Sequence, residues 1–161
     1  MSGMRLGVDV LGAGELDRLL TRPWFRRYTY ADAELAIADT FGASRSREFL
    51  AGRFAAKEAV LKALGTGVAA GIRPRQVGIL RADNAAPVVE LTGAASARAD
   101  AIGASDIAVS ISHKADYVVA VAIITANGST TSGGAHALAR ATVEQISARG
   151  AGNERTRSRD G

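Results

Sequence analysis

Alternating apolar residues predict several short strands in the first 126 residues. Residues 5–10 place Leu6, Val8 and Val10 on one face of a strand and polar or small residues on the other. Further strands are predicted over residues 77–81, 88–91, 107–112 and 117–124, with a tight connection at residues 113–116 between the last two. The pattern therefore predicts a strand at each end of a domain that covers about residues 4–126.

Helical spacing fills the segments between these strands. Short helices are predicted over residues 15–20, from a cap at Thr29 to Asp39, and from a cap at Thr92 to about residue 103. A longer helix begins at Ser44 or Ser46 and ends at residue 64, with a glycine following as its C-terminal cap. Its apolar stripe consists of Leu50, Phe54, Leu61 and Leu64.

Ionisable residues interrupt the long helix near this stripe. Lys57 falls in the middle of it, where its ammonium group must either extend to solvent or meet an anion. Glu58 and Lys62 lie one turn apart at the edge of the stripe. Such a pair is ordinarily a surface salt bridge worth about 0.2–0.5 kcal/mol. Because Lys57 adds a third ionisable group beside this pair, the three residues could instead form a functional site.

Asp9 lies at the end of the first strand, on the face that Gly7 leaves open. An acidic residue at such a place is often only a turn former. Paired with Glu58, it would supply two carboxylates, and magnesium usually takes one or two carboxylates together with substrate phosphates. Lys57 and Lys62 are then expected to meet the same phosphates.

Composition narrows the class of protein. No apolar run approaches the roughly 20 residues that span a bilayer, and the first ten residues lack the plan of a signal peptide. The chain has no cysteine, which excludes disulfides and thiolate metal sites. We therefore expect a cytoplasmic protein.

The net charge of +4 suits an acidic partner, a membrane or a nucleic acid, and part of it lies in the last residues. Aromatic residues make up only 5% of the chain, which disfavours single-stranded nucleic acid as a ligand because stacking platforms are scarce. Residues 127–134 are almost all glycine, serine and threonine. We expect residues 127–161 to form a flexible tail.

Three motifs, in order, carry a resemblance to a known family. The segment FLAGRFAAKEAVLKALGTG, residues 49–67, resembles the signature of holo-acyl-carrier-protein synthases, the small 4′-phosphopantetheinyl transferases. Residues 7–10 (GVDV) resemble that family's metal-binding strand. Residues 109–113 (VSISH), followed by Tyr117 and an apolar strand, resemble its C-terminal hairpin. Thr29 with Glu34 resembles its helix start, so that the match spans about residues 5–124.

The resemblance implies a magnesium site formed by Asp9 and Glu58. It implies that Glu58 and Lys62 are catalytic, with Glu58 a candidate base and Lys62 the cation that meets the coenzyme A phosphates. The remaining residues that it implies for coenzyme A are Arg53, Gly65, Thr66, Pro87, Ser112, His113 and Lys114. The family's Gly-Lys-Pro turn is Ala85-Ala86-Pro87 here, without the lysine, while Lys114 is a cation that could strengthen the hold on the 3′-phosphate.

The function implied is transfer of 4′-phosphopantetheine from coenzyme A to a serine of an apo acyl carrier protein. An inactive family member that only binds carrier or coenzyme A is the alternative, and a nucleic-acid-binding protein is suggested by charge alone. His113, at a strand end, has the simpler interpretation of a polar cap. Arg18 and Arg22 lie one turn apart and are the expected docking face for an acidic carrier, unless they serve only solubility.

The fold implied is α+β, with a twisted sheet packed on the long helix. In the last strand Val118, Ala120, Ala122 and Ile124 alternate with Val119, Val121 and Ile123, so both faces are apolar and both need cover. One small domain does not readily supply that cover. This agrees with the homotrimer that the resemblance implies.

Overall fold

The computed structural model describes residues 3–66, 71–82 and 85–126, so the expected tail at residues 127–161 lies outside the described residues. The elements are β1 (Met4–Gly12), α1 (Asp17–Leu20), α2 (Pro23–Thr29), α3 (Asp32–Ala38), α4 (Ala43–Ala63), the 3-10 turn η2 (Pro74–Gln76), β2 (Val77–Arg81), β3 (Pro87–Leu91), α5 (Gly93–Ala101), β4 (Ala104–Lys114) and β5 (Tyr117–Ala126). No helix in these described ranges is long and apolar enough to cross a membrane.

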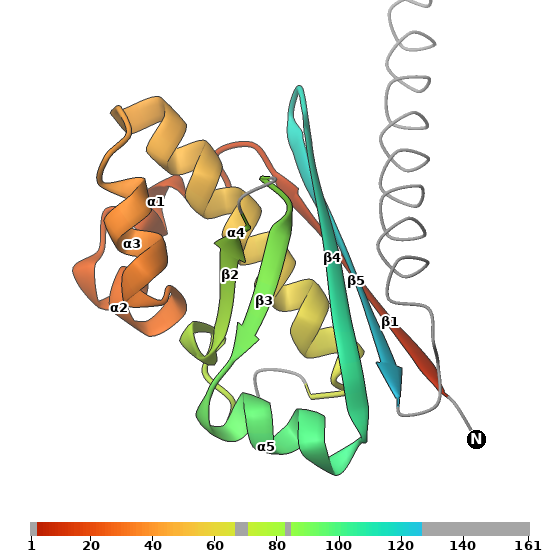
Figure 1. Cartoon of the computed structure of the whole chain (residues 1–161). Helices are drawn as coiled ribbons and strands as arrows, with labels where there is room; N and C mark the ends of the chain where they lie inside the picture. Colours follow the sequence, from red (N-terminus) through yellow and green to blue (C-terminus); the bar gives the residue numbers. More distant parts are fainter. Residues whose placement is uncertain (1–2, 67–70, 83–84, 127–161) are drawn as a thin grey trace, which may run out of the picture.

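Two antiparallel sheets lie on either side of the long helix α4 (Figure 1). The larger sheet has the strand order β1-β5-β4, and the smaller one pairs β2 with β3. The ends of the domain meet in the larger sheet, where Met4 lies opposite Thr125 and the Ala126 N–H donates to the Gly3 carbonyl oxygen at 3.0 Å. The α+β class is confirmed, although the expected single sheet is divided in two.

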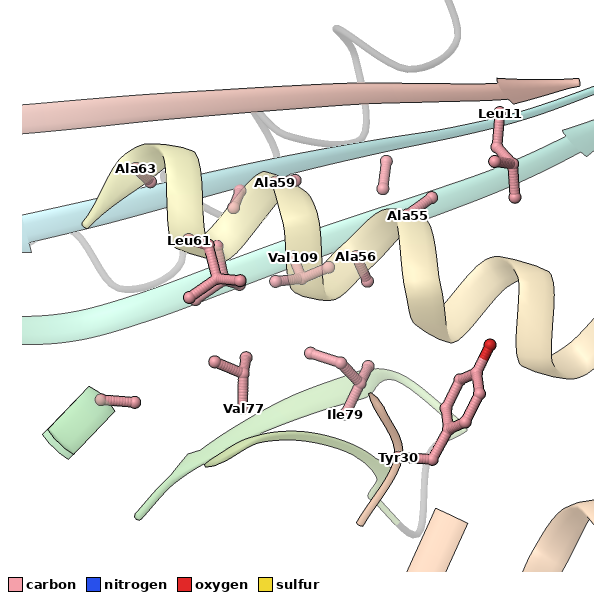
Figure 2. Close-up of a cluster of buried hydrophobic side chains, with 14 of the residues drawn as sticks. Leu11, Tyr30, Ala55, Ala56, Ala59, Leu61, Ala63, Val77, Ile79 and Val109 are labelled. Atoms are coloured by element: carbon pink, nitrogen blue, oxygen red, sulfur yellow. The ribbon is translucent and has the colours of Figure 1, made fainter. Parts of the chain in front are cut away.

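Small residues allow α4 to pack closely on the larger sheet. The helix presents Ala55, Ala59 and Ala63 to the core, all fully or almost fully buried (Figure 2). On the facing strand, a Cβ at Gly7 would overlap the Ala59 carbonyl oxygen and lie 2.7 Å from the Ala63 nitrogen. The backbones of β1 and α4 are therefore in direct contact beside Asp9, which fixes where that carboxylate lies.

The helices before α4 differ from the expected boundaries. Thr29 was predicted to cap a helix, but it is the last residue of α2. The next helix, α3, begins after Ala31, whose N–H is accepted by a Glu34 carboxylate oxygen at 2.7 Å. A glutamate three residues inside the helix therefore performs the capping that the sequence assigned to a threonine hydroxyl.

The face of the larger sheet that points away from α4 is also apolar. A second cluster there contains Ala108, Val119, Val121 and Ile123, with Val8 packed against it. Beside this cluster, the edge strand β1 exposes Met4 (58%), Leu6 (56%) and Val10 (53%). The alternation predicted for β5 is thus real, with one face covered by α4 and the other flanked by exposed apolar side chains.

Candidate active site

Asp9 and Lys62 meet at the edge of the larger sheet. The Lys62 ammonium group lies 2.7 Å from an Asp9 carboxylate oxygen and 2.9 Å from the Val8 carbonyl oxygen. The Lys62 side chain is 51% exposed and the Asp9 side chain 15%, so the pair faces solvent. The ion pair that the helix spacing suggested between Glu58 and Lys62 is thus made by Asp9 instead.

Glu58 belongs to the same cluster. It lies one turn before Lys62 on α4 and is half-buried. Burial raises the pKa of Glu58, the Asp9 charge raises it further, and the Lys62 charge lowers it. We call Asp9, Glu58 and Lys62 the carboxylate–lysine cluster, in which two acids repel one another beside a single ammonium group.

This cluster fits a magnesium ion. In the described part of the chain, no group of three or more histidine, cysteine, aspartate or glutamate residues could hold a metal. Magnesium needs only one or two carboxylates when phosphates and water supply its other ligands. The Asp9 charge contributes to the raised pKa of Glu58, so the two carboxylates interact, and Lys62 already places a positive charge beside Asp9.

The C-terminal end of α4 lies next to this cluster. Gly65 adopts φ of +72°, where a glycine is favoured, and its N–H donates to the Lys62 carbonyl oxygen at 3.0 Å. The Thr66 hydroxyl is buried and has no hydrogen-bond partner within residues 3–66, 71–82 and 85–126. Both residues directly follow α4, close to Lys62, and their contact with coenzyme A stays a prediction.

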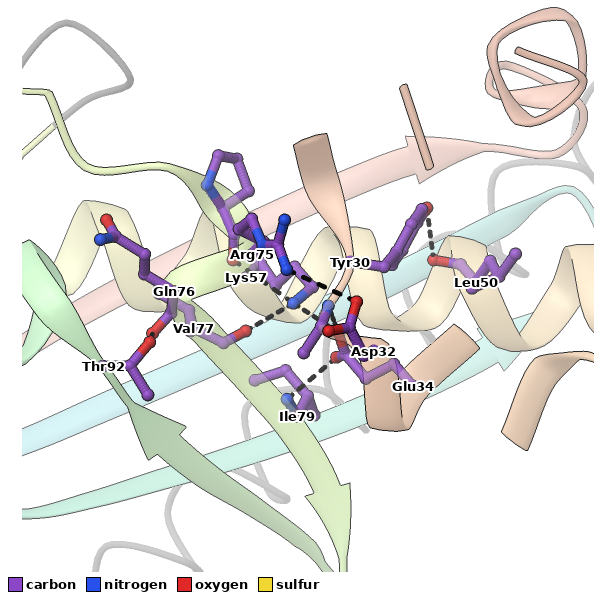
Figure 3. Close-up of polar contacts among 12 residues, drawn as sticks. Tyr30, Asp32, Glu34, Leu50, Lys57, Arg75, Gln76, Val77, Ile79 and Thr92 are labelled. Atoms are coloured by element: carbon purple, nitrogen blue, oxygen red, sulfur yellow. Dashed lines mark hydrogen bonds and ion pairs between the residues drawn. The ribbon is translucent and has the colours of Figure 1, made fainter. Parts of the chain in front are cut away.

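Lys57 does not join this site, and the expectation that it meets the same phosphates is wrong. Its ammonium group is fully buried, 2.7 Å from a Glu34 carboxylate oxygen, and it also donates to the Val77 and Pro74 carbonyl oxygens (Figure 3). The other Glu34 oxygen accepts from the Ile79 N–H at 2.9 Å. The anion that the sequence led us to expect beside Lys57 is therefore the Glu34 carboxylate, which stabilises the fold.

A second group of expected residues gathers at the opposite edge of the larger sheet. Its cavity of about 170 Å³, which we call the arginine pocket, is lined by Phe41, Arg45, Glu48, Phe49, Arg53, Arg81 and His113. Arg53 is only 6% exposed and lies over the Phe49 ring at 4.3 Å, while Arg45 lies over the Phe41 ring at 5.0 Å. The pocket thus collects three arginines and one histidine.

Arg53 is poorly satisfied as the structure stands. Its Nε is buried without a hydrogen-bond partner among the described residues. Burial lowers the pKa of Arg53, the Glu34 carboxylate raises it, and the Arg81 charge lowers it again. An anionic ligand bound between this buried guanidinium and the second cation would offset both the burial and the repulsion of the two charges.

His113 is placed by a glycine that sequence reasoning missed. The His113 Nε2 lies 3.2 Å from the Glu48 carbonyl oxygen, which can only accept, so this nitrogen carries the hydrogen. A Cβ at Gly52 would lie 2.8 Å from that nitrogen. Gly52 therefore makes the space in which the imidazole packs against α4. The convergence of Arg45, Arg81 and Gly52 was missed as well, because it exists only in the folded chain.

The remaining expected residues lie around these two groups. Pro87 begins β3 opposite Arg81, next to the arginine pocket. Ser112 lies on the sheet face away from α4. Lys114 is exposed and lines a cavity of about 370 Å³ near the β4–β5 turn, which shares Glu48 and His113 with the arginine pocket. Arg18 and Arg22 are both exposed, but the expectation that they lie one turn apart on one helix is wrong, because α1 ends at Leu20 and Arg22 is the extended residue before α2.

Within one chain, the carboxylate–lysine cluster and the arginine pocket lie on opposite sides of α4. Asp9 belongs to edge strand β1 and His113 to edge strand β4, with β5 between them. The helix packs over that middle strand, because Gly7 contacts Ala59 on one side and His113 contacts Gly52 on the other. The two halves of the expected site are therefore separated in one subunit.

Comparison with known proteins identifies the family of this chain. The model of the 4′-phosphopantetheinyl transferase superfamily matches residues 5–122. The holo-[acyl-carrier-protein] synthases of Exiguobacterium sp. and Natranaerobius thermophilus are 36% identical over 123 residues and 38% identical over 121 residues. These matches cover 76% and 74% of this chain, and 93% and 94% of the relatives.

A solved structure shows the same fold. The chain matches the "Chronobacterium ammoniagenes ACPS-CoA complex" with a TM-score of 0.66 and 27% identity, covering 78% of this chain and 98% of the other. The expectation of an enzyme of the holo-[acyl-carrier-protein] synthase type is confirmed. With a family match over most of the domain and relatives matched over nearly their whole length, this chain belongs to the 4′-phosphopantetheinyl transferase superfamily.

Proposed function

We propose that this chain transfers 4′-phosphopantetheine from coenzyme A to a serine hydroxyl of an apo acyl carrier protein, in a magnesium-dependent reaction that releases 3′,5′-ADP. The carboxylate–lysine cluster is the observation that carries the proposal, since it combines two acids for a metal with one cation for phosphate. The family relatives named as holo-[acyl-carrier-protein] synthases support the same reaction.

Charge neutralisation and positioning dominate such phosphoryl transfers. The serine oxygen forms a bond to the β-phosphorus while the bond from that phosphorus to the bridging oxygen breaks, so that 3′,5′-ADP leaves. Asp9 and Glu58 would hold the magnesium ion, which supplies positive charge to the pyrophosphate oxygens when bound. Lys62 is free to turn from Asp9 towards the substrate phosphates, because its side chain is half exposed.

A base must take the serine proton. Glu58 is our candidate, because it is a half-buried carboxylate within the carboxylate–lysine cluster. The arginine pocket, with Arg53 and His113, would hold another part of coenzyme A. Thr66 would offer its hydroxyl, which has no partner among the described residues, to the phosphates at the end of α4.

We further propose that the enzyme is a homotrimer with active sites between subunits. The exposed Met4, Leu6 and Val10 of β1 flank an already apolar sheet face, which suits burial against another copy. The separation of the carboxylate–lysine cluster from the arginine pocket also favours a shared site. In that arrangement the metal ligands of one subunit face His113 of the next.

Co-expression of two inactive variants tests this sharing. We expect Asp9→Ala and His113→Ala chains to be impaired separately and to recover part of the activity in mixed oligomers, because some interfaces then pair two intact halves. Sedimentation must confirm that mixed oligomers form. Activity no greater than the average of the parents would assign each site to one chain.

Incubation with coenzyme A, magnesium and an apo carrier tests the reaction itself. Intact-mass measurement should show the carrier gaining one phosphopantetheine group, with 3′,5′-ADP appearing in equal amount and neither forming in EDTA. Fatty-acid and polyketide carriers should both be offered. Binding of coenzyme A without any change in carrier mass would instead support an inactive binding module.

A further inference from the structure

The expected pyrophosphate site lies at the C-terminal end of α4, the end of a helix that is less favourable for an anion. Lys62 belongs to the last turn of this helix, which ends at Ala63. The final backbone carbonyl oxygens of a helix point away from it and give its C-terminus about half a negative charge. Phosphate groups usually bind at the opposite end, where N–H groups point outward. A pyrophosphate beside Lys62 therefore requires groups that offset this negative end.

The backbone itself satisfies part of the C-terminal end of α4. The Thr66 N–H donates to the Leu61 carbonyl oxygen at 3.2 Å, and the Gly65 N–H donates to that of Lys62 at 3.0 Å. This pair of bonds around a glycine with positive φ is the Schellman motif, which commonly ends helices. The motif leaves the next two carbonyl oxygens along the chain to other donors.

Two arginines from different elements bind these remaining oxygens. Arg5 of β1 donates from its Nε to the Ala63 carbonyl oxygen at 2.9 Å. Arg98 of α5 donates from its Nε to the Leu64 carbonyl oxygen at 3.0 Å. A Cβ at Gly65 would lie 2.5 Å from a terminal nitrogen of Arg5 and 3.4 Å from one of Arg98. Both guanidinium groups therefore lie against the glycine that ends α4, so two positive charges face the negative end of the helix.

Strand β1 links one of these arginines to the carboxylate–lysine cluster. Arg5, Gly7 and Asp9 alternate along one face of β1, the face that packs on α4. Asp9 meets Lys62, and Arg5 meets the backbone of the next residue, Ala63. The strand that supplies a carboxylate to the cluster therefore also supplies a cation to the helix end beside that cluster.

We infer that Arg5 and Arg98 are positioning residues, which cap the C-terminal end of α4 and offset its negative charge so that the pyrophosphate of coenzyme A binds beside Lys62. The inference rests on the proposed function. Gly65 lies three residues beyond Lys62, about 5 Å along the helix axis, whereas salt screens charges over about 10 Å at 0.1 M. The two guanidinium groups are therefore close enough to act on a ligand that Lys62 holds.

Calorimetry of coenzyme A binding to the full chain, with magnesium and without carrier protein, tests this role. Arg5→Gln combined with Arg98→Gln should weaken binding on the order of tenfold at low ionic strength, because the negative end of the helix is then no longer offset. The difference between this variant and the wild type should shrink as sodium chloride is raised towards about 1 M, where charges are screened within about 3 Å. Arg5→Lys combined with Arg98→Lys keeps both charges and should retain most of the wild-type affinity.

Arg27→Gln combined with Arg73→Gln is the matched control, because it removes the same charge from two exposed arginines elsewhere in the fold, and it should bind coenzyme A as the wild type does. A loss of affinity that salt does not change, or that the lysine variant shares in full, would reduce the two arginines to a structural cap and overturn the inference. Equal affinity of the glutamine variant and the wild type at low salt would overturn it as well. Transfer is scored separately: a wild-type chain that shows the salt-dependent difference but modifies no carrier supports the inference and contradicts the proposed reaction.

Discussion

Two lysines of α4 lie five positions apart and have opposite surroundings. Lys57 is fully buried, and its ammonium group meets one carboxylate and two backbone carbonyl oxygens. Lys62 is half exposed and pairs with Asp9 at the edge of the sheet, close to a second carboxylate, Glu58. Each lysine meets an acid at 2.7 Å, so the ion-pair distance does not distinguish them.

The difference lies in what each pair leaves unsatisfied. The three ammonium hydrogens of Lys57 have three acceptors, and the Glu34 carboxylate also receives two backbone N–H groups. In the Asp9–Lys62 pair, the Glu58 carboxylate remains in excess, and the half-exposed Lys62 side chain is free to move. A saturated buried pair stabilises one arrangement of α3, α4 and β2, whereas an unsaturated exposed pair can take up a ligand.

The largest expected effect is on stability, when one partner of the buried pair is removed. Lys57→Met leaves the Glu34 carboxylate charged in the core, so we expect unfolding to become easier by about 3–5 kcal/mol. Lys62→Met is the matched control and should change stability by at most about 1 kcal/mol. Urea denaturation followed by circular dichroism measures both.

A double variant separates the ion pair from simple packing. Lys57→Met combined with Glu34→Gln removes both charges, so it should be more stable than Lys57→Met alone. Equal losses for Lys57→Met and Lys62→Met would mean that burial does not distinguish the two pairs.

The carboxylate–lysine cluster should show the reverse, a loss of activity without a loss of stability. Glu58→Gln is nearly isosteric, but an amide is a much weaker magnesium ligand, so transfer should fall by at least about two orders of magnitude. The melting temperature should stay unchanged. Glu90→Gln, on the exposed side of β3, serves as the control. Near-normal turnover of Glu58→Gln at limiting magnesium would remove Glu58 from the metal site.

Alkaline pH should weaken the buried region in particular. Burial, and secondarily the Glu34 charge, raise the pKa of Tyr30 far above its usual value of 10.0. The tyrosine therefore stays protonated in the folded chain and ionises only when the chain unfolds. Stability should fall as pH rises above 10, by about 1.4 kcal/mol per pH unit for one proton.

Tyr30→Phe isolates this effect from other groups. The variant loses the bond to the Leu50 carbonyl oxygen, about 0.5–1.5 kcal/mol, at every pH. Its stability should nevertheless decline less steeply above pH 10 than that of the wild type. Lys57 and Glu34 face Tyr30 in both chains, so their contributions cancel in the difference. Parallel pH curves for the two chains would contradict the assignment.

Exposed arginines without a described ion pair should matter least to the isolated enzyme. Charge reversal at Arg18 and Arg22 should leave stability and the KM for coenzyme A unchanged, and raise the KM for carrier about tenfold. Added salt should weaken the wild-type interaction with carrier in the same direction. Charge reversal at Arg73 is the control, and an effect limited to coenzyme A would contradict a docking role.

Much of this architecture follows from local sequence. Continuous apolar runs marked the strands that became β2 and β5, in which consecutive residues are buried. The spacing of α4 predicted that Lys57 must meet an anion or reach solvent, which is correct. The identity of that anion was not predictable, since Glu34 lies 23 positions earlier and reaches Lys57 only after α3 packs on α4.

The proximity of candidate site residues could be predicted from the sequence only where they lie on the same helix or strand. Glu58 and Lys62 share a helix, and their closeness follows from its period. Arg81 comes from a strand and Arg45 from the first turn of α4, so their meeting depends on how the smaller sheet packs. The role of Gly52 was also hidden, because a glycine in a helix shows its purpose only when His113 packs against it.

The pairing of β1 with β5 has a consequence for the synthesis of the protein on the ribosome. Among the described strands, the first one bonds only to the last, so β1 cannot enter its sheet until residues 117–126 have emerged. Until then the apolar side chains of β1 and the backbone edge of the strand have no native partner. The nascent chain therefore carries an unprotected strand until β5 has emerged, and chaperone binding in this interval is expected to concern the residues of β1.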